Sequence, residues 1–460
     1  MGPMETFDGI VIGTGQAGPS LAVRLASAGW RVAVVERARF GGTCVNTGCM
    51  PTKTLVASAY AAHLARRAAD YGIDAGEVRV DMKRVKARKD KVADTASANV
   101  ESWLRATRNV TVIEGHARFE SPTTVRIGER MLEAPKIFVD VGARALVPQM
   151  PGLSGVPYYT NSTIMDVDFL PEHLVVIGGS YVGLEFAQVY RRFGSEVTVV
   201  EKAPRLIARE DGDVSDAVRA ILAAEGVKIE TGAECMSVAL AGRGVTVDLD
   251  CAGGSRSVRG SHLLLAVGRT PNTDDLGLDR AGVATDARGY VKVDDGLCTS
   301  VPGIYALGEC NGRGAFTHTT YNDYEIVADN LLNDAGRSVR DRIDAYALFI
   351  DLPLARVGMS DDAIRKSGRK ALVGKRPMTR VGRAVEKGET QGFMKIAVDA
   401  RTKEILGATI LGVNGDEAIH AVLDCMYARA PATALTRMVH IHPTVAELLP
   451  TIAAELVPLE

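Results

Sequence analysis

A glycine-rich pattern that occurs twice constrains the fold of this chain more than any other feature of its sequence. In its first copy, DGIVIGTGQAG at residues 8–18, an apolar strand runs directly into Gly13, Gly15 and Gly18 in the spacing G-x-G-x-x-G. A helical stretch follows, and a second strand, RVAVVE, ends at Glu36. A dinucleotide site requires this order, because the glycines let the backbone approach a pyrophosphate at a helix N-terminus and the acid binds ribose hydroxyls.

The second copy, HLVVIGGSYVGLEFAQVYRRFGSEVTVVE at residues 173–201, repeats the strand, glycine turn, helix, strand and terminal acid. The same number of residues separates Gly178 from Glu201 as separates the first glycine from the terminal acid in the first copy. Gly183 supplies the third glycine, but Ser180 replaces the middle one, where its hydroxymethyl group crowds the closest backbone approach. The repeat predicts two dinucleotide-binding domains. A nucleotide fold that has lost its ligand is the alternative for either copy.

Two cysteines in GGTCVNTGCMPTK, residues 41–53, stand five positions apart. Five steps of a continuous α-helix rise about 7.5 Å, whereas a disulfide needs Cα atoms roughly 4.4 to 6.8 Å apart. Cys44 and Cys49 can therefore form a bridge only across a distorted turn, which the Asn and Gly between them tolerate. Pro51 suits the first turn of a helix, so we expect Cys49 at a helix N-terminus, where the dipole lowers the pKa of a thiol. The pattern favours a redox-active dithiol.

Two other interpretations of the cysteine pair are weaker. Zinc sites usually have closer cysteine spacing and four ligands, and no second cysteine pair accompanies this one. A purely structural bridge would close too short a loop to stabilise the fold much through chain entropy. We therefore predict no metal site.

The composition favours a multidomain protein without a nucleic-acid or membrane partner. A length of 460 residues exceeds what one hydrophobic core usually supports. The formal net charge of −2 gives no overall attraction to nucleic acid or to an anionic membrane. No apolar run reaches the length of a membrane span, the N-terminus lacks a signal-peptide pattern, and seven cysteines are too few for a secreted disulfide scaffold. A cytoplasmic location is therefore expected. The basic segment at residues 79–91 is predicted to form a solvated helix face.

With these motifs together, the chain resembles the flavoprotein disulfide reductases, such as glutathione reductase, dihydrolipoamide dehydrogenase and mercuric reductase. The resemblance runs nearly end to end. LLLAVGRTPNTDDLGL, residues 263–278, is similar to the segment that contains Gly268 and returns the chain from the nicotinamide domain to the flavin domain. TSVPGIYALGEC, residues 299–310, resembles the second flavin motif, in which Glu309 replaces the usual Asp that binds the ribityl chain.

The last resembling stretch, HIHPTVAE at residues 440–447, is similar to the acid–base motif of the family. An imidazole with a pKa near neutrality can protonate a leaving thiolate and then accept the proton back, while a carboxylate fixes its tautomer. The resemblance assigns these tasks to His442 and Glu447. His440 has no such pattern and is expected to be a structural neighbour.

The resemblance implies an α/β fold with two Rossmann-like dinucleotide-binding domains, for FAD and for NAD(P), and a C-terminal α+β dimerisation domain. In the family this last domain forms a homodimer, and its His reaches the dithiol of the other subunit, so the active site is shared. The implied domains are residues 1–149 (FAD-binding, first part), 150–272 (NAD(P)-binding), 273–342 (FAD-binding, second part) and 343–460 (interface).

The resemblance also implies roles for single residues. Cys49 would face the flavin and carry the charge-transfer thiolate, and Cys44 would be the interchange thiol that attacks the substrate. Lys53 and Glu185 resemble the ion pair beside the reactive nitrogen of the flavin, where a cation stabilises the reduced form. Tyr181 matches the residue that covers the flavin until nicotinamide displaces it, and a packing aromatic is the alternative. The cofactor-binding part of the cysteine stretch also includes Gly42 and Thr43.

The terminal acid of the second copy predicts a preference for NADH over NADPH. The Glu201 carboxylate can accept hydrogen bonds from a ribose 2′-hydroxyl and would repel a 2′-phosphate. Lys202 and Arg205 follow it and are the residues that could bind a phosphate instead.

The electron acceptor is less constrained. Residues 316–327 and 352–361 look closest to a mercuric-reductase-like branch that includes reductases linked to reactive chlorine and copper stress. True mercuric reductases carry a C-terminal cysteine pair and a Tyr in place of the active-site His, whereas this chain ends TIAAELVPLE and keeps His442. We therefore predict an FAD-dependent NAD(P)H oxidoreductase that reduces a small-molecule disulfide or a metal ion. Dihydrolipoamide dehydrogenase, mercuric reductase and a flavin-binding sensor with little turnover are the alternatives.

Overall fold

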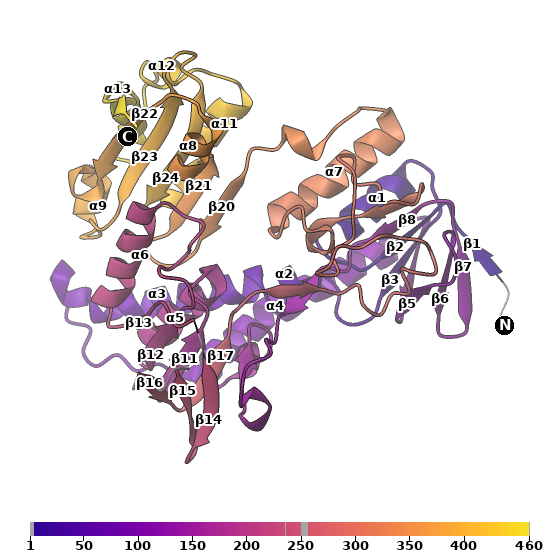
Figure 1. The fold of residues 1–460 in the computed structure, drawn as a ribbon, viewed down its shortest axis with the longest axis horizontal. Coiled ribbons are helices and arrows are strands. Elements are labelled where there is room, and N and C mark those ends of the chain that lie inside the picture. The colour runs from indigo at the N-terminus through magenta and orange to yellow at the C-terminus, as the bar shows by residue number, and fades with distance from the viewer. Residues whose placement is uncertain (1–3, 235, 250–255, 460) are drawn as a thin grey trace.

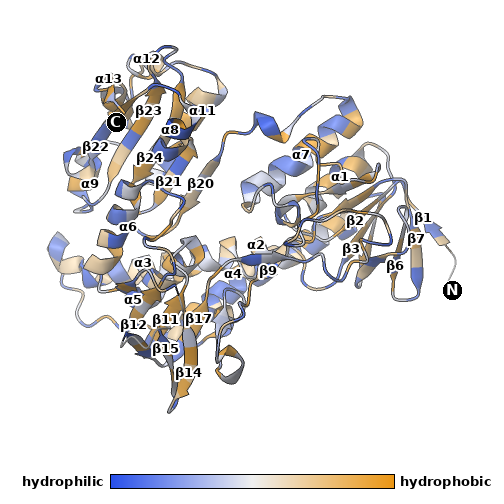
Figure 2. Ribbon diagram, in the orientation of Figure 1, coloured by the Kyte–Doolittle hydropathy of each residue, from blue (hydrophilic) through white to orange (hydrophobic). Residues whose placement is uncertain are grey.

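The structure is a computed structural model, and it describes residues 4–234, 236–249 and 256–459. Figure 1 shows three lobes, of which the lobe on the right combines indigo and orange segments from distant parts of the chain. A magenta lobe lies below, and the yellow C-terminal lobe lies at the upper left. The strands inside each lobe are mainly hydrophobic, as Figure 2 shows, so each lobe is built around its own sheet.

The sheet of the right-hand lobe is parallel and has the strand order β19-β8-β2-β3-β4. Every residue of β2 and β3 is buried, because helices cover one face of the sheet and the strands at residues 117–133 pack against the other. The edge strand β19 belongs to a segment far along the chain and returns to pair with β8. The strands and the helices that pack on them are β2 (Gly9–Ile12), β3 (Val32–Glu36), β4 (Val110–Glu114), β8 (Ile137–Val139), β19 (Ile304–Ala306), α1 (Gly18–Ser27) and α7 (Thr317–Asn333).

The lower lobe repeats this arrangement with the parallel order β10-β17-β11-β12-β13. Its elements are β10 (Tyr159–Thr160), β11 (His173–Ile177), α5 (Tyr181–Phe193), β12 (Glu196–Val200), α6 (Gly212–Ala224), β13 (Lys228–Glu230) and β17 (His262–Leu265). A small antiparallel sheet joins β14 (Ser237–Ala241), β15 (Gly244–Asp248) and β16 (Ser257–Gly260).

Smaller elements connect and extend the first two lobes. The helices α2 (Gly42–Asn46), α3 (Cys49–Arg66) and α4 (Met82–Ala106) follow β3, and α3 packs against α5 of the lower lobe. A four-stranded sheet flanks the right-hand lobe, with the order β1 (Met4–Thr6), β7 (Arg130–Glu133), β6 (Thr124–Ile127) and β5 (Ala117–Phe119). The crossing point between the lobes is a two-stranded ladder of β9 (Ala143–Ala145) and β18 (Arg269–Pro271).

The C-terminal lobe is an antiparallel sheet with helices, and is therefore α+β. Its strand order is β20 (Ala345–Leu348), β21 (Leu354–Gly358), β24 (Ile405–Leu411), β23 (Phe393–Asp399), β22 (Ala371–Pro377) and β25 (Val457–Pro458). Its helices are α8 (Asp361–Ser367), α9 (Gly382–Glu386), α10 (Gly415–Ala418), α11 (His420–Tyr427), α12 (Ala432–Leu435) and α13 (Leu449–Ala454). One buried apolar cluster contains side chains of α3, α5 and the start of this lobe, so the three lobes share part of a core.

The basic segment at residues 79–91 differs in part from its prediction. The helix α4 begins at Met82, after Asp81, whose carboxylate accepts the Arg84 N–H at 3.1 Å as an N-cap. Most of the basic side chains are exposed as predicted, but Lys89 is buried and forms an ion pair with Asp90. None of the helices in the described ranges is long and apolar enough to cross a bilayer.

Candidate active site

The two cysteines lie on either side of a break between helices. Cys44 is in α2, and Cys49 is the first residue of α3. Gly48 between them has φ −127° and ψ −117°, which is far from helical geometry. The predicted distorted turn and the predicted helix N-terminus at Cys49 are both confirmed, and the Cys44 and Cys49 side chains hydrogen-bond to each other as free thiols.

A hydroxyl group from a distant helix contacts both sulfur atoms. Thr317, the first residue of α7, donates from Oγ1 to Cys44 Sγ at 3.0 Å, and the same oxygen lies 3.2 Å from Cys49 Sγ. The hydrogen bond with Cys44 lowers the pKa of Cys49 to about 6, with further lowering by Thr317 and by the charge of Lys53, against the opposing effect of burial. The same pairing and burial raise the pKa of Cys44. The site therefore favours a thiolate at Cys49 and a thiol at Cys44.

A salt bridge between two lobes lies next to the dithiol. Lys53 follows Cys49 by one helical turn on α3, and its Nζ donates to Glu185 Oε2 at 2.7 Å. The Glu185 side chain, on α5, is only 3% exposed, whereas that of Lys53 is 34% exposed. The pair thus joins the first lobe to the second and places a cation at the cavity that contains the cysteines.

One large cavity, with a volume of about 1040 Å³, runs between the lobes and collects most of the predicted site residues. It is lined by Gly13, Gly15, Glu36, Gly42, Thr43, Cys44, Cys49, Lys53, Tyr181, Glu185 and Glu309. Among the described residues, the predicted positions that do not line it are Gly18, Gly178, Ser180, Gly183, Glu201, Gly268, His442 and Glu447.

The first glycine turn presents bare backbone to this cavity. Gly13 has φ +99°, and a Cβ atom on it would lie 2.2 Å from the carbonyl oxygen of Asp140. The Asp140 carboxylate accepts the Gly18 N–H at 2.7 Å. At the end of β3, Glu36 Oε2 accepts from the N–H and the hydroxyl of Thr14 at 3.0 and 2.6 Å. A Cβ atom on Gly18 would likewise lie 2.4 Å from the Gly13 carbonyl oxygen, so the turn and the helix start pack too closely for side chains and leave backbone at the cavity wall.

The predicted ribityl-binding acid has a cationic partner. Glu309 Oε1 accepts from Arg269 Nε at 2.6 Å, and both side chains are 15% exposed. Gly268, with φ +128°, precedes this arginine. Tyr181 lines the same cavity, and its ring centroid lies 5.6 Å from that of Phe316.

The second glycine turn leads into α5, and its three motif positions differ in whether they have room for a side chain. Gly178 has φ +118°, and a Cβ atom on Gly183 would lie 2.0 Å from the Gly178 carbonyl oxygen, so both positions require glycine. Ser180 has φ −108° and an exposed side chain, so its backbone is unstrained. Glu201, directly after β12, accepts the N–H groups of Gly179 and Ala203 at 2.5 and 2.7 Å.

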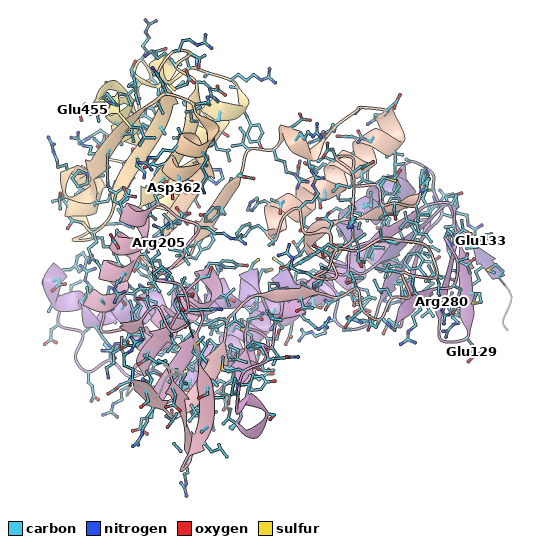
Figure 3. All side chains as sticks on the ribbon, in the orientation of Figure 1. Glu129, Glu133, Arg205, Arg280, Asp362 and Glu455 are labelled. Carbon is cyan, nitrogen blue, oxygen red and sulfur yellow. The ribbon has the colours of Figure 1, made fainter. Side chains whose placement is uncertain are left out.

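The loop after β12 is held against the C-terminal lobe. Arg205 Nη2 lies 3.4 Å from the Ala208 carbonyl oxygen, to which it donates, and 3.9 Å from Asp362 Oδ2. Figure 3 shows Arg205 and Asp362 on the facing sides of the two lobes. Further along the loop, Arg356 of β21 donates from Nε to Glu210 Oε2 at 2.8 Å, and both side chains are buried.

The predicted acid–base pair is formed, but on another surface of the chain. His442 Nδ1 lies 2.9 Å from Glu447 Oε2, and the imidazole is 81% exposed. The pair does not line the cavity that contains the cysteines of its own chain.

Comparison with known proteins identifies the family. Residues 7–323 match the model of the pyridine nucleotide-disulphide oxidoreductases, and residues 345–453 match the dimerisation domain of the same proteins. The chain belongs to this family. The predicted fold class is confirmed, with two dinucleotide-binding domains and a C-terminal dimerisation domain.

Individual relatives of this oxidoreductase match along almost its whole length. It is 36% identical to the probable pyridine nucleotide-disulfide oxidoreductase RclA of Escherichia coli (strain K12), over 97% of this chain and 98% of that protein. It is 33% identical to a dihydrolipoyl dehydrogenase of Thermus scotoductus, over 96% of each chain. The solved structure of a Cu(II) complex of HOCl-induced flavoprotein disulfide reductase RclA from Escherichia coli superposes with a TM-score of 0.90 at 34% identity, covering 98% and 99% of the two chains.

The predicted reaction class, a pyridine nucleotide-disulfide oxidoreductase, is confirmed by this family membership. The family depends on FAD and uses pyridine nucleotides. The residues around the first glycine turn fit FAD, since close-packed glycines, a carboxylate at a strand end and a large cavity meet there. In the part of the chain that the structure describes, no three His, Cys, Asp or Glu side chains are arranged to hold a metal ion.

Two residues of the site were not predicted from the sequence. Thr317 lies in the stretch at residues 316–327, and Arg269 in the stretch at residues 263–278, and neither pattern predicts a site role for these two residues. Each acts on a predicted residue that is 40 or more positions away in sequence. The position of Thr317 after a glycine-rich turn, at the start of a helical pattern, was the available signal.

Proposed function

We propose that this oxidoreductase passes electrons from a nicotinamide through Cys44 and Cys49 to a small-molecule disulfide or to a metal ion that binds thiols. The observation that carries the proposal is the asymmetric dithiol, with the pKa of Cys49 lowered to about 6 and that of Cys44 raised. In the balanced reaction, one NADH and one proton reduce one disulfide to two thiols and give NAD⁺. With copper, one NADH reduces two Cu(II) to two Cu(I) and releases one proton.

The two cysteines have different roles in this proposal. Cys49, at the N-terminus of α3 and within reach of the positive charge of Lys53, is the charge-transfer thiolate. Cys44 is the interchange thiol that attacks the acceptor. Lys53 and Glu185 form the ion pair at the reactive part of the flavin, with the lysine as the cation that stabilises negative charge there.

Bound FAD would supply the two-electron chemistry between the nicotinamide and the dithiol. Gly13, Gly15 and Gly18 are the proposed pyrophosphate site, and Glu36 is the proposed partner of the adenosine ribose. Arg269 orients Glu309, whose carboxylate would accept from a ribityl hydroxyl. Pairing of β19 with β8 supports an FAD-binding unit formed by residues 1–149 and 273–342, with residues 150–272 as the nicotinamide domain and residues 343–460 as the interface domain.

His442 and Glu447 would complete the active site of a partner subunit in a homodimer. The imidazole is exposed, and the Glu447 carboxylate at Nδ1 fixes its orientation. Its Nε2 atom could then exchange a proton with a thiolate of the partner subunit. The apolar side chains beside it, Val439 and Ile441, are 99% and 80% exposed. Such a surface favours burial against another chain, and these residues lie within the range that matches the family dimerisation domain. We also propose a cytoplasmic location, where thiols stay reduced.

The nicotinamide in this proposal is NADH. The Glu201 carboxylate accepts from two backbone N–H groups at the end of β12, where a ribose 2′-hydroxyl would also donate to it. Arg205, the cation best suited to a 2′-phosphate, is directed toward Ala208 and Asp362.

Steady-state oxidation of NADH with a panel of disulfides, Cu(II), Hg(II) and quinones tests the acceptor. Cys44→Ser is the matched variant, because it removes the interchange thiol and keeps Cys49. The proposal expects turnover with a disulfide or with Cu(II) that Cys44→Ser abolishes. Turnover with quinones alone, unchanged in Cys44→Ser, would contradict it. Turnover with the disulfide lipoamide or with Hg(II) above all others would favour dihydrolipoamide dehydrogenase or mercuric reductase instead.

A further inference from the structure

The segment that follows β20 is attached to one face of α5. The helix offers Glu185, Gln188 and Arg192 at spacings of three and four residues, so the three side chains lie on one face. Gln188 Oε1 accepts the N–H of Asp351 at 2.6 Å, and Arg192 Nη1 forms an ion pair with the Asp351 carboxylate at 2.7 Å. Because β20 opens the C-terminal lobe, this attachment fixes that lobe to the helix that carries Glu185.

Phe349, at the start of this segment, contacts both members of the Lys53–Glu185 pair. Its backbone N–H donates to Glu185 Oε1 at 2.9 Å, while Lys53 donates to the other carboxylate oxygen at 2.7 Å. Its ring lies under the ammonium group, with Lys53 Nζ 4.7 Å from the ring centroid. Phe349 also lines the cavity that contains the cysteines.

We propose that Phe349 is a positioning residue that holds the Lys53 ammonium group beside Cys49 by supporting it with its ring and by orienting Glu185 with its backbone. The inference deepens the proposed function and rests on it, since it assigns a support to the cation of that site. A lysine side chain has several rotatable bonds, and here it is one-third exposed, so one hydrogen bond to Glu185 leaves it freedom to move. An aromatic face under a partly desolvated ammonium adds a second, independent attraction.

The charge of Lys53 gives this position a measurable consequence. Three side chains lower the pKa of Cys49. Cys44 on α2 and Thr317 on α7 act through hydrogen bonds, and Lys53 on α3 acts through its charge. If the ring is removed, the ammonium group spends less time near the thiolate, and the thiolate should form at higher pH. The backbone N–H to Glu185 remains in any side-chain variant, so the effect of the ring can be isolated.

The test is a pH titration of the long-wavelength charge-transfer absorbance in the two-electron-reduced, FAD-loaded enzyme, for wild type, Phe349→Leu and Phe349→Tyr. We expect Phe349→Leu to raise the midpoint by about 0.5 to 1 pH unit, and Phe349→Tyr, which keeps a ring, to restore the wild-type value. Phe393→Leu is the matched control, because Lys375 Nζ lies 4.0 Å from the centroid of that ring in the C-terminal lobe. It should lower thermal stability without moving the midpoint.

The outcomes separate this inference from the proposed function. An unchanged midpoint in Phe349→Leu would overturn the inference while leaving the dithiol mechanism intact, as would an equal shift in Phe393→Leu. Absence of the band in wild type would overturn both. If Phe349→Leu does not fold, Phe349→Met provides the unbranched apolar replacement, and the same rise in midpoint is expected from it.

Discussion

Removing the charge of Glu201 should move the coenzyme preference toward NADPH. The carboxylate accepts two backbone N–H groups, from Gly179 at 2.5 Å and from Ala203 at 2.7 Å. Glu201→Gln keeps an acceptor oxygen for one of these groups, so the turn is preserved better than with alanine. The change therefore tests the charge rather than the shape of the strand end.

The size of the change in coenzyme preference follows from the position of the Glu201 charge. Two unit charges about 4 Å apart repel by roughly 1 kcal/mol in bulk water and by roughly 4 kcal/mol near a protein surface. A 2′-phosphate at the Glu201 carboxylate would therefore bind about fivefold to a thousandfold more weakly than it would without the charge. Because the carboxylate is half-buried, we expect Glu201→Gln to raise kcat/KM for NADPH relative to NADH by at least about tenfold.

The structure adds a second perturbation at the same loop. Arg205 lies 3.9 Å from Asp362, a pair in which both side chains are more than one-third exposed, so its attraction is worth about 1 kcal/mol or less. Asp362→Asn should release the guanidinium and raise kcat/KM for NADPH by up to about fivefold. Arg205→Ala combined with Asp362→Asn should cancel that gain.

Steady-state kinetics with both coenzymes, at fixed acceptor and low salt, measure these ratios. Glu196→Gln is the matched control, since it removes the same charge at the exposed start of β12 and should leave the ratio unchanged. A wild-type preference for NADPH of tenfold or more would refute the reasoning, and its loss in Arg205→Ala would show that the arginine binds the phosphate despite Asp362. An unchanged ratio in Glu201→Gln would show that the carboxylate does not face the ribose.

Four further outcomes are expected. The purified enzyme should be yellow, and after two-electron reduction its charge-transfer band should rise as pH increases through about 6, vanish in Cys49→Ser and persist in Cys44→Ser, whereas the reverse pattern would exchange the two roles. Thr317→Val should raise the midpoint of that band by about one pH unit, because a hydrogen bond to a charged group is worth about 1.5 kcal/mol or more, and Thr317→Ser should restore the wild-type midpoint. Equal midpoints in wild type and Thr317→Val would show that the hydroxyl does not lower the pKa of Cys49. His442→Ala should slow the reaction with a disulfide by about 10² to 10⁴ and spare flavin reduction by NADH, whereas equal losses in both half-reactions would make the residue structural. Since the pKa of Cys49 falls from 9.0 to about 6 on folding, the thiolate should stabilise the reduced enzyme fully above pH 9. This stabilisation should be lost as pH falls through about 6. Thermal unfolding of wild type and Cys49→Ser across this pH range measures the effect.

Much of the local structure was predictable because its determinants are close together in sequence. Both strand–turn–helix units appear where the glycine spacing placed them, and the first helix after the dithiol begins at Cys49 as expected. The basic segment shows the limit of such reasoning. Its spacing predicted a helix correctly, but Lys89 is buried, and its neighbour Arg88 contacts α3 by donating to the Thr54 carbonyl at 2.9 Å. That packing depends on a neighbouring helix, which periodicity within one segment does not contain.

The sequence by itself determined the fold class, the two nucleotide turns and the reactive cysteine pair, because glycine spacing, strand periodicity and the position of a helix start are local properties. Only the tertiary structure decided how the chemistry of the site is tuned. Thr317 reaches both sulfur atoms, Phe349 reaches the Lys53–Glu185 pair and Asp362 reaches Arg205 from segments more than 150 residues away. The physical reason is that hydrogen bonds and charges act over a few ångströms of space, and a folded chain brings together at that range side chains whose separation along the sequence carries no signal.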